Sequence, residues 1–423
     1  MTGKAMAMPY SSSQRAPLQT AAVISCAIAF CSPWAASQEL ILPSAPGAEV
    51  RLLTSDSAIL ESTDNRKDLP CTVTPVKPVI GFDMKFHAGY DIQVPLKELS
   101  GSENQLTIVF RVTPDGHPGS PVFFRQHYAV PSIEENAGGS AYLQGGVIMG
   151  EGKYHIDWVM RDRQERVCSF HWDADANVPQ HDRPMTIDLA PGSVQQIDPE
   201  IFKEEGPVER EKAATPLNVK VMVNFAPQDS TSSTLQPLDT VALVSILRSI
   251  ARDPHVGSFS VVAYNMQEQR VIYRQDASAQ IDFPALGQSL NSLNLGTVDL
   301  KKLSQKHGDS EFLSNLITSE IKSAPDQPDA VIFAGPKIML DDGLPPETLK
   351  QLVDVKFPVF YMNYNLNPQV NPWRDAISNT VRALKGAEFT IARPRDLFFS
   401  WSDIVSRIVK SKFGRTGIAS SSQ

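Results

Sequence analysis

The sequence predicts an antiparallel β-sandwich over residues 79–191, followed by an α/β domain with a doubly wound, mostly parallel sheet over residues 216–413. Apolar and polar residues alternate through the first region, which is the period of a half-buried strand. In the second region, apolar runs of strand length alternate with segments whose apolar residues recur at helical spacing. The stretch at 192–215 is charged, contains proline and lacks both patterns, so we expect a linker there.

Two stretches of alternating residues carry the sandwich prediction. QLTIVFRV at 105–112 and YHIDWVM at 154–160 each place four apolar side chains on one face. The polar residues 162–166 then indicate a turn, and 167–172 returns as the second arm of a long hairpin. The architecture is immunoglobulin-like in general, although the Cys…Trp…Cys spacing of a true immunoglobulin domain is missing. Residues 38–78 precede it as an irregular lead-in.

The first 37 residues have the parts of a secretion signal. Lys4 and Arg15 give a positive leader, an apolar run follows at 18–30, and small residues stand at 35–37. We expect cleavage near Ser37 and a location in the periplasm or outside the cell. A membrane-anchoring or buried core helix is the alternative, and Cys26, in a loosely lipoprotein-like context, leaves lipidation open. No other segment approaches the length of a membrane span, so no stable span is expected after cleavage.

Export bears on the state of the four cysteines. Cys26 and Cys31 lie in the predicted signal, which leaves Cys71 and Cys168. Two cysteines alone in an exported protein most simply form one disulfide, and two free thiols are the alternative. The pair is too small for a structural zinc site without histidine ligands.

Composition and motifs argue against several partners and cofactors. The chain has 423 residues, enough for two or three domains, and a formal net charge of −8, which repels a nucleic-acid backbone. No GxGxxG or Walker loop follows the first strand of the second region, so we expect no cofactor. The motifs GxSxG and HExxH are missing as well. We therefore predict no catalytic residues.

Six histidines fall in the first region, and two of them stand on opposite arms of its hairpin. His155 and His171, with Asp157 nearby, are the best candidates for a metal-binding site in this region. The spacing matches no tight ligand motif, however. The alternative, which we favour, is that these are surface residues on the polar face of two strands.

The second region has a specific order of elements. A strand and a helix come first, then a two-strand hairpin, two helices and three strand–helix units. Residues 414–423 are expected to form a disordered tail. The expected strands are 217–225, 259–265, 270–274, 329–334, 357–363 and 388–392, and the expected helices are 238–252, 283–295, 311–321, 346–353, 373–384 and 401–413.

This order of elements resembles that of the von Willebrand factor A domain, over residues 216–413. The one antiparallel strand early in the sheet separates it from a dinucleotide-binding fold. A looser resemblance, carried by GEGKY at 150–154 and the turn at 161–166, is to secreted acidobacterial proteins of the VWFA-related type. Both resemblances imply a bacterial protein that binds other proteins outside the cytoplasm.

The metal-ion-dependent adhesion site that the family often carries is degenerate here. The family uses DxSxS after the first strand, and the corresponding residues are Asn224, Ala226 and Gln228. Thr297 matches the family's threonine, whereas Ala-Gly-Pro at 334–336 stands where an aspartate is typical. Without its carboxylates such a site lacks the charge that offsets cation dehydration, so we expect no metal.

A second segment has the form of the missing motif. Asp229–Ser233 reads DSTSS, which is DxTxS, but it begins five residues beyond the expected position. Using it as a ligand set would require a shifted loop. The alternative is a flexible loop rich in serine and threonine, and we favour it.

The carboxyl ends of the strands remain the favoured ligand edge of an open α/β sheet. Amide and aromatic side chains there suit a neutral polar partner such as protein backbone or sugar, and ordinary turn residues are the alternative. We predict an exported, non-catalytic binding or assembly protein with a protein partner. A secreted hydrolase or carbohydrate-acting enzyme is the alternative. The candidate contact residues are Asn224, Gln228, Asp229, Thr297, Asn363 and Tyr364.

Overall fold

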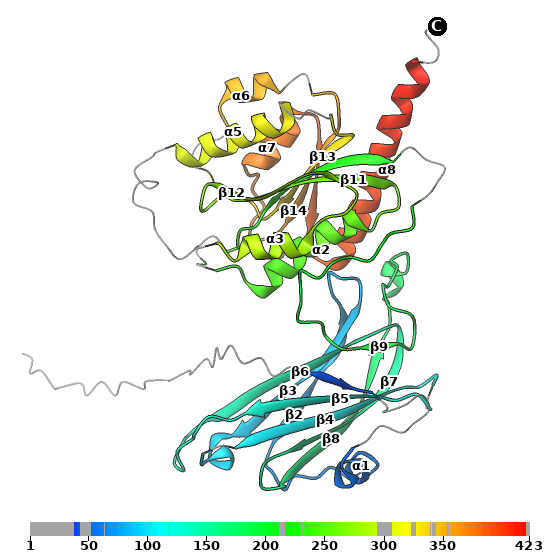
Figure 1. The fold of residues 1–423 in the computed structure, drawn as a ribbon, viewed down its shortest axis with the longest axis vertical. Coiled ribbons are helices and arrows are strands. Elements are labelled where there is room, and N and C mark those ends of the chain that lie inside the picture. Colours follow the sequence, from blue (N-terminus) through cyan, green and yellow to red (C-terminus); the bar gives the residue numbers. More distant parts are fainter. Residues whose placement is uncertain are drawn as a thin grey trace, which may run out of the picture. The chain divides into compact units, whose positions relative to one another are not determined.

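The first domain of the computed structural model is a sandwich of two antiparallel sheets (Figure 1). Tyr90 from one sheet packs edge-on against Phe110 and Trp158 from the other, with ring centroids 5.5 and 5.6 Å apart. These buried rings join the two sheets into one core, which confirms the predicted sandwich. The larger sheet has the order β1 (Glu39–Ile41), β5 (Val122–Ala129), β4 (Gln105–Pro114), β7 (Gly152–Arg161), β8 (Val167–Ala176); the smaller has β2 (Thr72–Ile80), β3 (Phe86–Pro95), β6 (Ser140–Met149), β9 (Val194–Gln195).

The structure describes most of the chain after residue 37. By their contacts, residues 38–423 fall into one compact unit. The predicted signal at 1–37, with Cys26, lies outside the described residues. Searched over the described residues, no helix is both long and apolar enough to cross a bilayer. The described residues are 38–42 and 52–419, without 63, 103, 118, 211–215, 230–231, 233, 294–306, 323–326, 339, 341–343 and 353–354.

Short helices accompany the sandwich. The helix α1 (Thr54–Leu60) lies within the predicted lead-in. Its Ile59 and Leu60 pack with Val109 of β4 and Val159 of β7, on the face of the larger sheet that points away from the main core. Two 3-10 helices follow, at Leu96–Leu99 and Gln180–Asp182.

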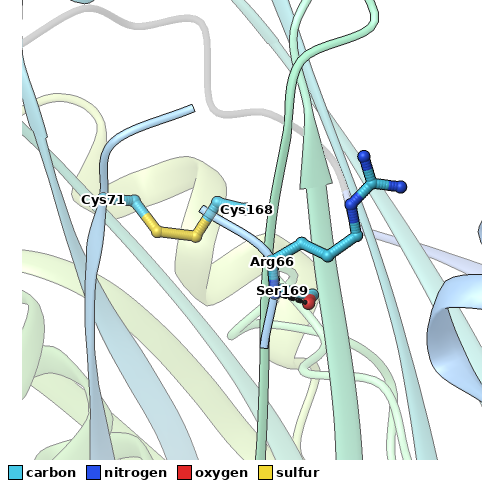
Figure 2. The surroundings of a disulfide bond; sticks show 4 residues. All are labelled: Arg66, Cys71, Cys168 and Ser169. Carbon is cyan, nitrogen blue, oxygen red and sulfur yellow. Dashed lines mark hydrogen bonds between the residues drawn. A yellow bond between two sulfur atoms is a disulfide. The ribbon is translucent and has the colours of Figure 1, made fainter. Parts of the chain in front are cut away.

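A disulfide joins the two sheets. Cys71, directly before β2, is bonded to Cys168 of β8, with the Cα atoms 6.3 Å apart and a sequence separation of 97 (Figure 2). Beside it, the backbone N–H of Arg66 donates to Ser169 Oγ at 2.8 Å, and the N–H of Ser169 donates to the Arg66 carbonyl at 2.9 Å. The predicted pairing is confirmed, and such a bond is typical of an oxidising compartment outside the cytoplasm.

The second domain is built on one six-stranded sheet. Five strands are parallel, and β12 pairs antiparallel with β11 at one edge. This confirms the predicted α/β class and agrees with the resemblance to the von Willebrand factor A domain. The strand order is β12 (Arg270–Ser278), β11 (Val256–Asn265), β10 (Leu217–Asn224), β13 (Ala330–Gly335), β14 (Val359–Tyr364), β15 (Ala387–Ile391).

Helices cover both faces of this sheet, as its uniformly apolar strands require (Figure 1). One face packs against α2 (Pro237–Ala251), α3 (Phe283–Leu290) and α8 (Pro394–Ala419). The other carries α5 (Gly308–Lys322), α6 (Pro346–Gln351) and α7 (Ala376–Ala383). The last helix begins before the predicted 401–413 and continues into the segment expected to be a tail.

The turn between β2 and β3 packs into the core of the second domain. Phe82 and Met84 on this turn are buried among side chains of α2, α8 and the sheet. The ring of Phe82 meets that of Tyr364 edge-on, with centroids 6.2 Å apart. The ion pair between Arg395 and Asp182, at 3.0 Å, adds a polar contact between the domains.

The central strand β10 carries a buried charge. Lys220 Nζ lies 2.6 Å from Glu320 Oε2 of α5 and donates to the Glu320 carbonyl at 3.0 Å. Both side chains are almost fully buried. The other carboxylate oxygen of Glu320 pairs at 2.6 Å with Arg274, which is half exposed. The pair ties α5 to the middle of the sheet.

We expect Glu320→Ala to lower the free energy of unfolding by about 3–5 kcal/mol, because it leaves the Lys220 ammonium buried without a carboxylate to neutralise it. The double variant Lys220→Met/Glu320→Leu removes both charges and should lose much less. Urea unfolding followed by circular dichroism measures both. Equal losses in the single and the double variant would contradict the assignment.

Candidate functional site

Asparagines stand at the carboxyl ends of three strands. Asn224 ends β10, Asn265 ends β11, and Asn363 lies one residue before the end of β14. Their side chains are buried, with exposed fractions of 2%, 0% and 0%. Buried amides need hydrogen-bond partners, so these residues are part of the framework of the edge and not of its outer surface.

The amides at β10 and β11 tie these two strand ends together. Asn224 Oδ1 accepts from the backbone N–H of Met266 at 3.2 Å. Asn265 Nδ2 donates to the Phe225 carbonyl at 2.6 Å, and its Oδ1 accepts from the N–H of Glu268 at 2.7 Å. The turn between β11 and β12 is thereby held against the segment that follows β10.

Further amides hold the loop after β14. Asn363 Nδ2 donates to Glu388 Oε1 of β15 at 3.0 Å. Asn365, which is 3% exposed, accepts from Gln228 Nε2 at 3.2 Å and donates to the Asn371 carbonyl at 3.2 Å. One side chain therefore joins the loop after β10 to the loop after β14.

The end of β13 has no room for an acidic side chain. Gly335 has φ 140°, and a Cβ at that position would lie 2.9 Å from both Cβ and the carbonyl oxygen of Asn224. Two residues later, Lys337 Nζ donates to the Asn371 carbonyl at 2.7 Å and to the Trp373 carbonyl. It also lies 5.1 Å from the centroid of the Trp373 ring. The chain thus places a cation of its own at this edge.

The described residues of this edge do not fit a divalent metal ion. The amide oxygen of Asn224 is engaged by a backbone N–H, and the described residues directly after β13, at 336–338, include no carboxylate. Among the residues with described positions, no group of three histidine, cysteine, aspartate or glutamate side chains is arranged to hold a metal. Thr297 and three residues of Asp229–Ser233, namely 230, 231 and 233, lie outside the described part of the chain.

Tyr364 and Asp239 lie under the edge. Tyr364 is fully buried on the α2 and α8 side of the sheet. Burial raises the pKa of its phenol, and the nearby negative charge of Asp239 raises it further. Burial likewise raises the pKa of Asp239. Hydrogen bonds to its carboxylate, such as that from the N–H of Gln236 at 3.2 Å, act in the opposite direction and lower this pKa. Asp239 therefore helps to fix the start of α2.

Other residues face solvent at this edge. Of the predicted contact residues, Gln228 is half-buried and Asp229 is exposed. Leu238 in the first turn of α2 is 50% exposed, and Val370 in the loop after β14 is 76% exposed. Neither Leu238 nor Val370 is among the contact residues predicted from the sequence. The sequence does contain a signal for both residues: Val370 is an apolar residue within an asparagine-rich loop, and Leu238 is an apolar residue at the start of a predicted helix.

The histidine cluster of the sandwich is an ion-pair network. His155 Nδ1 hydrogen-bonds with Asp173 Oδ1 at 2.7 Å, and its Nε2 with Asp157 Oδ1 at 3.2 Å. Burial alone lowers the pKa of His155, but the bonds and charges of Asp173 and Asp157 outweigh burial and raise it. The ring of His171 lies 6.1 Å away, centroid to centroid. Because both nitrogens of His155 are engaged by carboxylates, neither is free to bind a metal.

Comparison with known proteins gives only weak matches. No family model and no curated protein matches the sequence. A mutant of the PilB minor pilin from Streptococcus sanguinis matches with a TM-score of 0.27 and 8% identity, over 62% of this chain and 76% of that one. Bacteroides uniformis β-glucuronidase matches with a TM-score of 0.18 and 8% identity, over 72% and 39%. Matches of this strength establish neither the fold nor the function.

We expect Asn365→Ala to free the loop after β14. The N–H of Asn367 donates to Asn365 Oδ1 at 3.2 Å. In the variant this bond is lost, so the hydrogen exchange of the Asn367 N–H should accelerate, because the free energy of local opening falls by about 1–3 kcal/mol. The matched control is Gln369→Ala, which truncates an exposed amide in the same loop and leaves the measured N–H of Asn367 unchanged. Unchanged exchange in Asn365→Ala would show that this amide does not hold the loop.

We also expect His155→Gln to change how stability depends on pH. The folded pKa of His155 lies above the usual 6.5, so its contribution is fully present below pH 6.5 and is lost as pH rises through the raised pKa. The difference in unfolding free energy between wild type and variant should therefore shrink with rising pH. His127→Gln, at an exposed histidine bonded to Thr107, serves as the control. A difference that is constant with pH would refute the charged network.

Proposed function

We propose that the chain is an exported, non-catalytic binding or assembly protein that contacts a protein partner through the carboxyl edge of its second domain. Residues 216–413 are, in this proposal, a domain of the von Willebrand factor A type whose metal site has lost its carboxylate ligands. The disulfide between Cys71 and Cys168 supports a secreted or periplasmic location.

The exposure of Val370 carries the proposal. A valine 76% exposed in a loop that buried amides hold in place is a preformed apolar contact. Leu238, half exposed at the start of α2, adds a second apolar side chain at the same edge. Apolar side chains surrounded by polar groups are typical of protein contact surfaces. Gln228 and Asp229 supply polar groups there.

The ligand chemistry follows from the framework beneath. The family site presents a metal whose open position accepts a carboxylate from the partner. Here the amides of Asn224, Asn265 and Asn363 take backbone and side-chain hydrogen bonds instead. We infer that recognition rests on apolar contact and neutral hydrogen bonds, without a metal-bridged carboxylate.

The double variant Leu238→Glu/Val370→Glu should lose the partner. The immobilised wild-type chain is incubated with an extract of the envelope of the cells that make it, and the retained proteins are identified. A partner held by this edge should bind the double variant at least about tenfold more weakly, because two desolvated contacts are replaced by charges. Both positions are exposed, so stability should be unchanged.

The matched control is Tyr142→Glu, which places the same charge at a side chain 73% exposed on the sandwich. It should retain the partner as the wild type does. Equal retention by the edge variant, or loss in the control alone, would place the contact elsewhere.

A further inference from the structure

A cavity of about 570 Å³ lies between α2, α8 and the turn that joins β2 to β3. Its volume is within the range of about 300–1,000 Å³ that is usual for small-molecule sites. One wall is formed by α8, whose Ser402 and Ser406 line the cavity together with a row of apolar side chains. The apolar residues recur at helical spacing and span eleven positions, or roughly 16 Å at 1.5 Å per residue. They are Phe398, Trp401, Val405 and Val409.

The turn from the sandwich closes the cavity on another side. Phe82 and Met84 contribute two further apolar side chains to the lining. Each of them, like Trp401 and Val405, is 7% exposed, so the apolar part of the lining is largely shielded from water. An apolar chain that enters the cavity would remove this remaining surface from water, which is favourable.

The opposite wall, on α2, is polar but neutralised. Arg248 and Arg252 face the cavity, and both guanidinium groups pair with Glu205, at 2.8 Å each. Ser249 Oγ donates to the Ser245 carbonyl at 2.9 Å. These groups satisfy one another and do not need a charged ligand.

The carboxylates that line the cavity are also engaged. Asp253 accepts from Trp401 Nε1 at 2.9 Å and bonds with His255 Nδ1 at 2.9 Å. Asp83 bonds with His87 Nε2 at 2.8 Å, and Asp188 pairs with Arg252. None of these acids is left to attract a cation.

Lys410 differs from the other charged groups of the lining. It is exposed at the α8 end of the cavity, next to Val409, and has no ion-pair partner within the described part of the chain. The apolar wall therefore ends at an unneutralised ammonium group.

We propose that this cavity binds a long-chain carboxylate, with its alkyl chain along Phe398, Trp401 and Val405 and its carboxylate at Lys410. The apolar side chains favour an alkyl chain, and the ammonium of Lys410 favours a negatively charged head group. The site needs none of the residues proposed for the protein partner, so the two proposals stand or fall separately.

The test uses the full chain and decanoate as the probe, by isothermal titration calorimetry below the concentration at which the probe forms micelles. We expect one saturable site per chain. Decyltrimethylammonium, with the same alkyl chain and the opposite charge, should bind more weakly. Lys410→Gln should weaken decanoate binding about two- to fivefold, as expected for an exposed charge.

Two further variants separate the site from non-specific uptake. Ser402→Trp enlarges an exposed side chain of the lining, so it should block decanoate while leaving the fold intact. Lys356→Gln removes the charge of an exposed lysine outside the cavity and should change nothing. Non-saturable binding, equal affinity for the two probes, or full affinity in both Lys410→Gln and Ser402→Trp would overturn the proposal.

Discussion

Buried amides at the carboxyl edge of the α/β sheet are the constraint on which the proposed function depends. A buried amide that lacks partners costs free energy, so Asn224, Asn265 and Asn365 fix the loops that satisfy them. In the family this chain resembles, a metal ion and its carboxylate ligands occupy this edge. Here neutral hydrogen bonds and the ammonium of Lys337 stand in that region. In the proposed function, these hydrogen bonds hold the edge in place, and exposed Val370 is the contact that they position.

The sandwich is coupled to this domain through one turn. Phe82 packs on Tyr364, and Tyr364 lies beside Asp239 at the start of α2. The same turn closes the cavity between α2 and α8. Packed cores transmit small displacements because they are dense. The cavity is lined by residues near the end of α2, such as Arg248, and the proposed partner contact includes Leu238 in the first turn of the same helix.

The periodicity of apolar residues in the sequence predicted the fold of both domains, but it did not predict which side chains are buried at the candidate site. Alternation at 105–112 and 154–160 predicted β4 and β7, and the two cysteines outside the signal predicted the bridge. The carboxyl edge was placed by the strand order. Tyr364 was predicted as a contact residue, but its side chain is buried in the core. The sequence held a signal for this, because Tyr364 continues the alternation of the buried residues Phe360 and Met362. The packing of Phe82 into another domain has no local signal, because tertiary contact alone decides it.

The most direct test of the central claim is calorimetric titration of Mg²⁺, Mn²⁺ and Ca²⁺ into the full chain. The account predicts no binding at micromolar strength, because the amide of Asn224 is engaged, a Cβ at Gly335 would be too close to Asn224, and the described residues form no carboxylate set at this edge. Micromolar binding of one ion per chain that Asp229→Asn abolishes would contradict it, since Asp229–Ser233 would then supply the ligands that the strand ends lack.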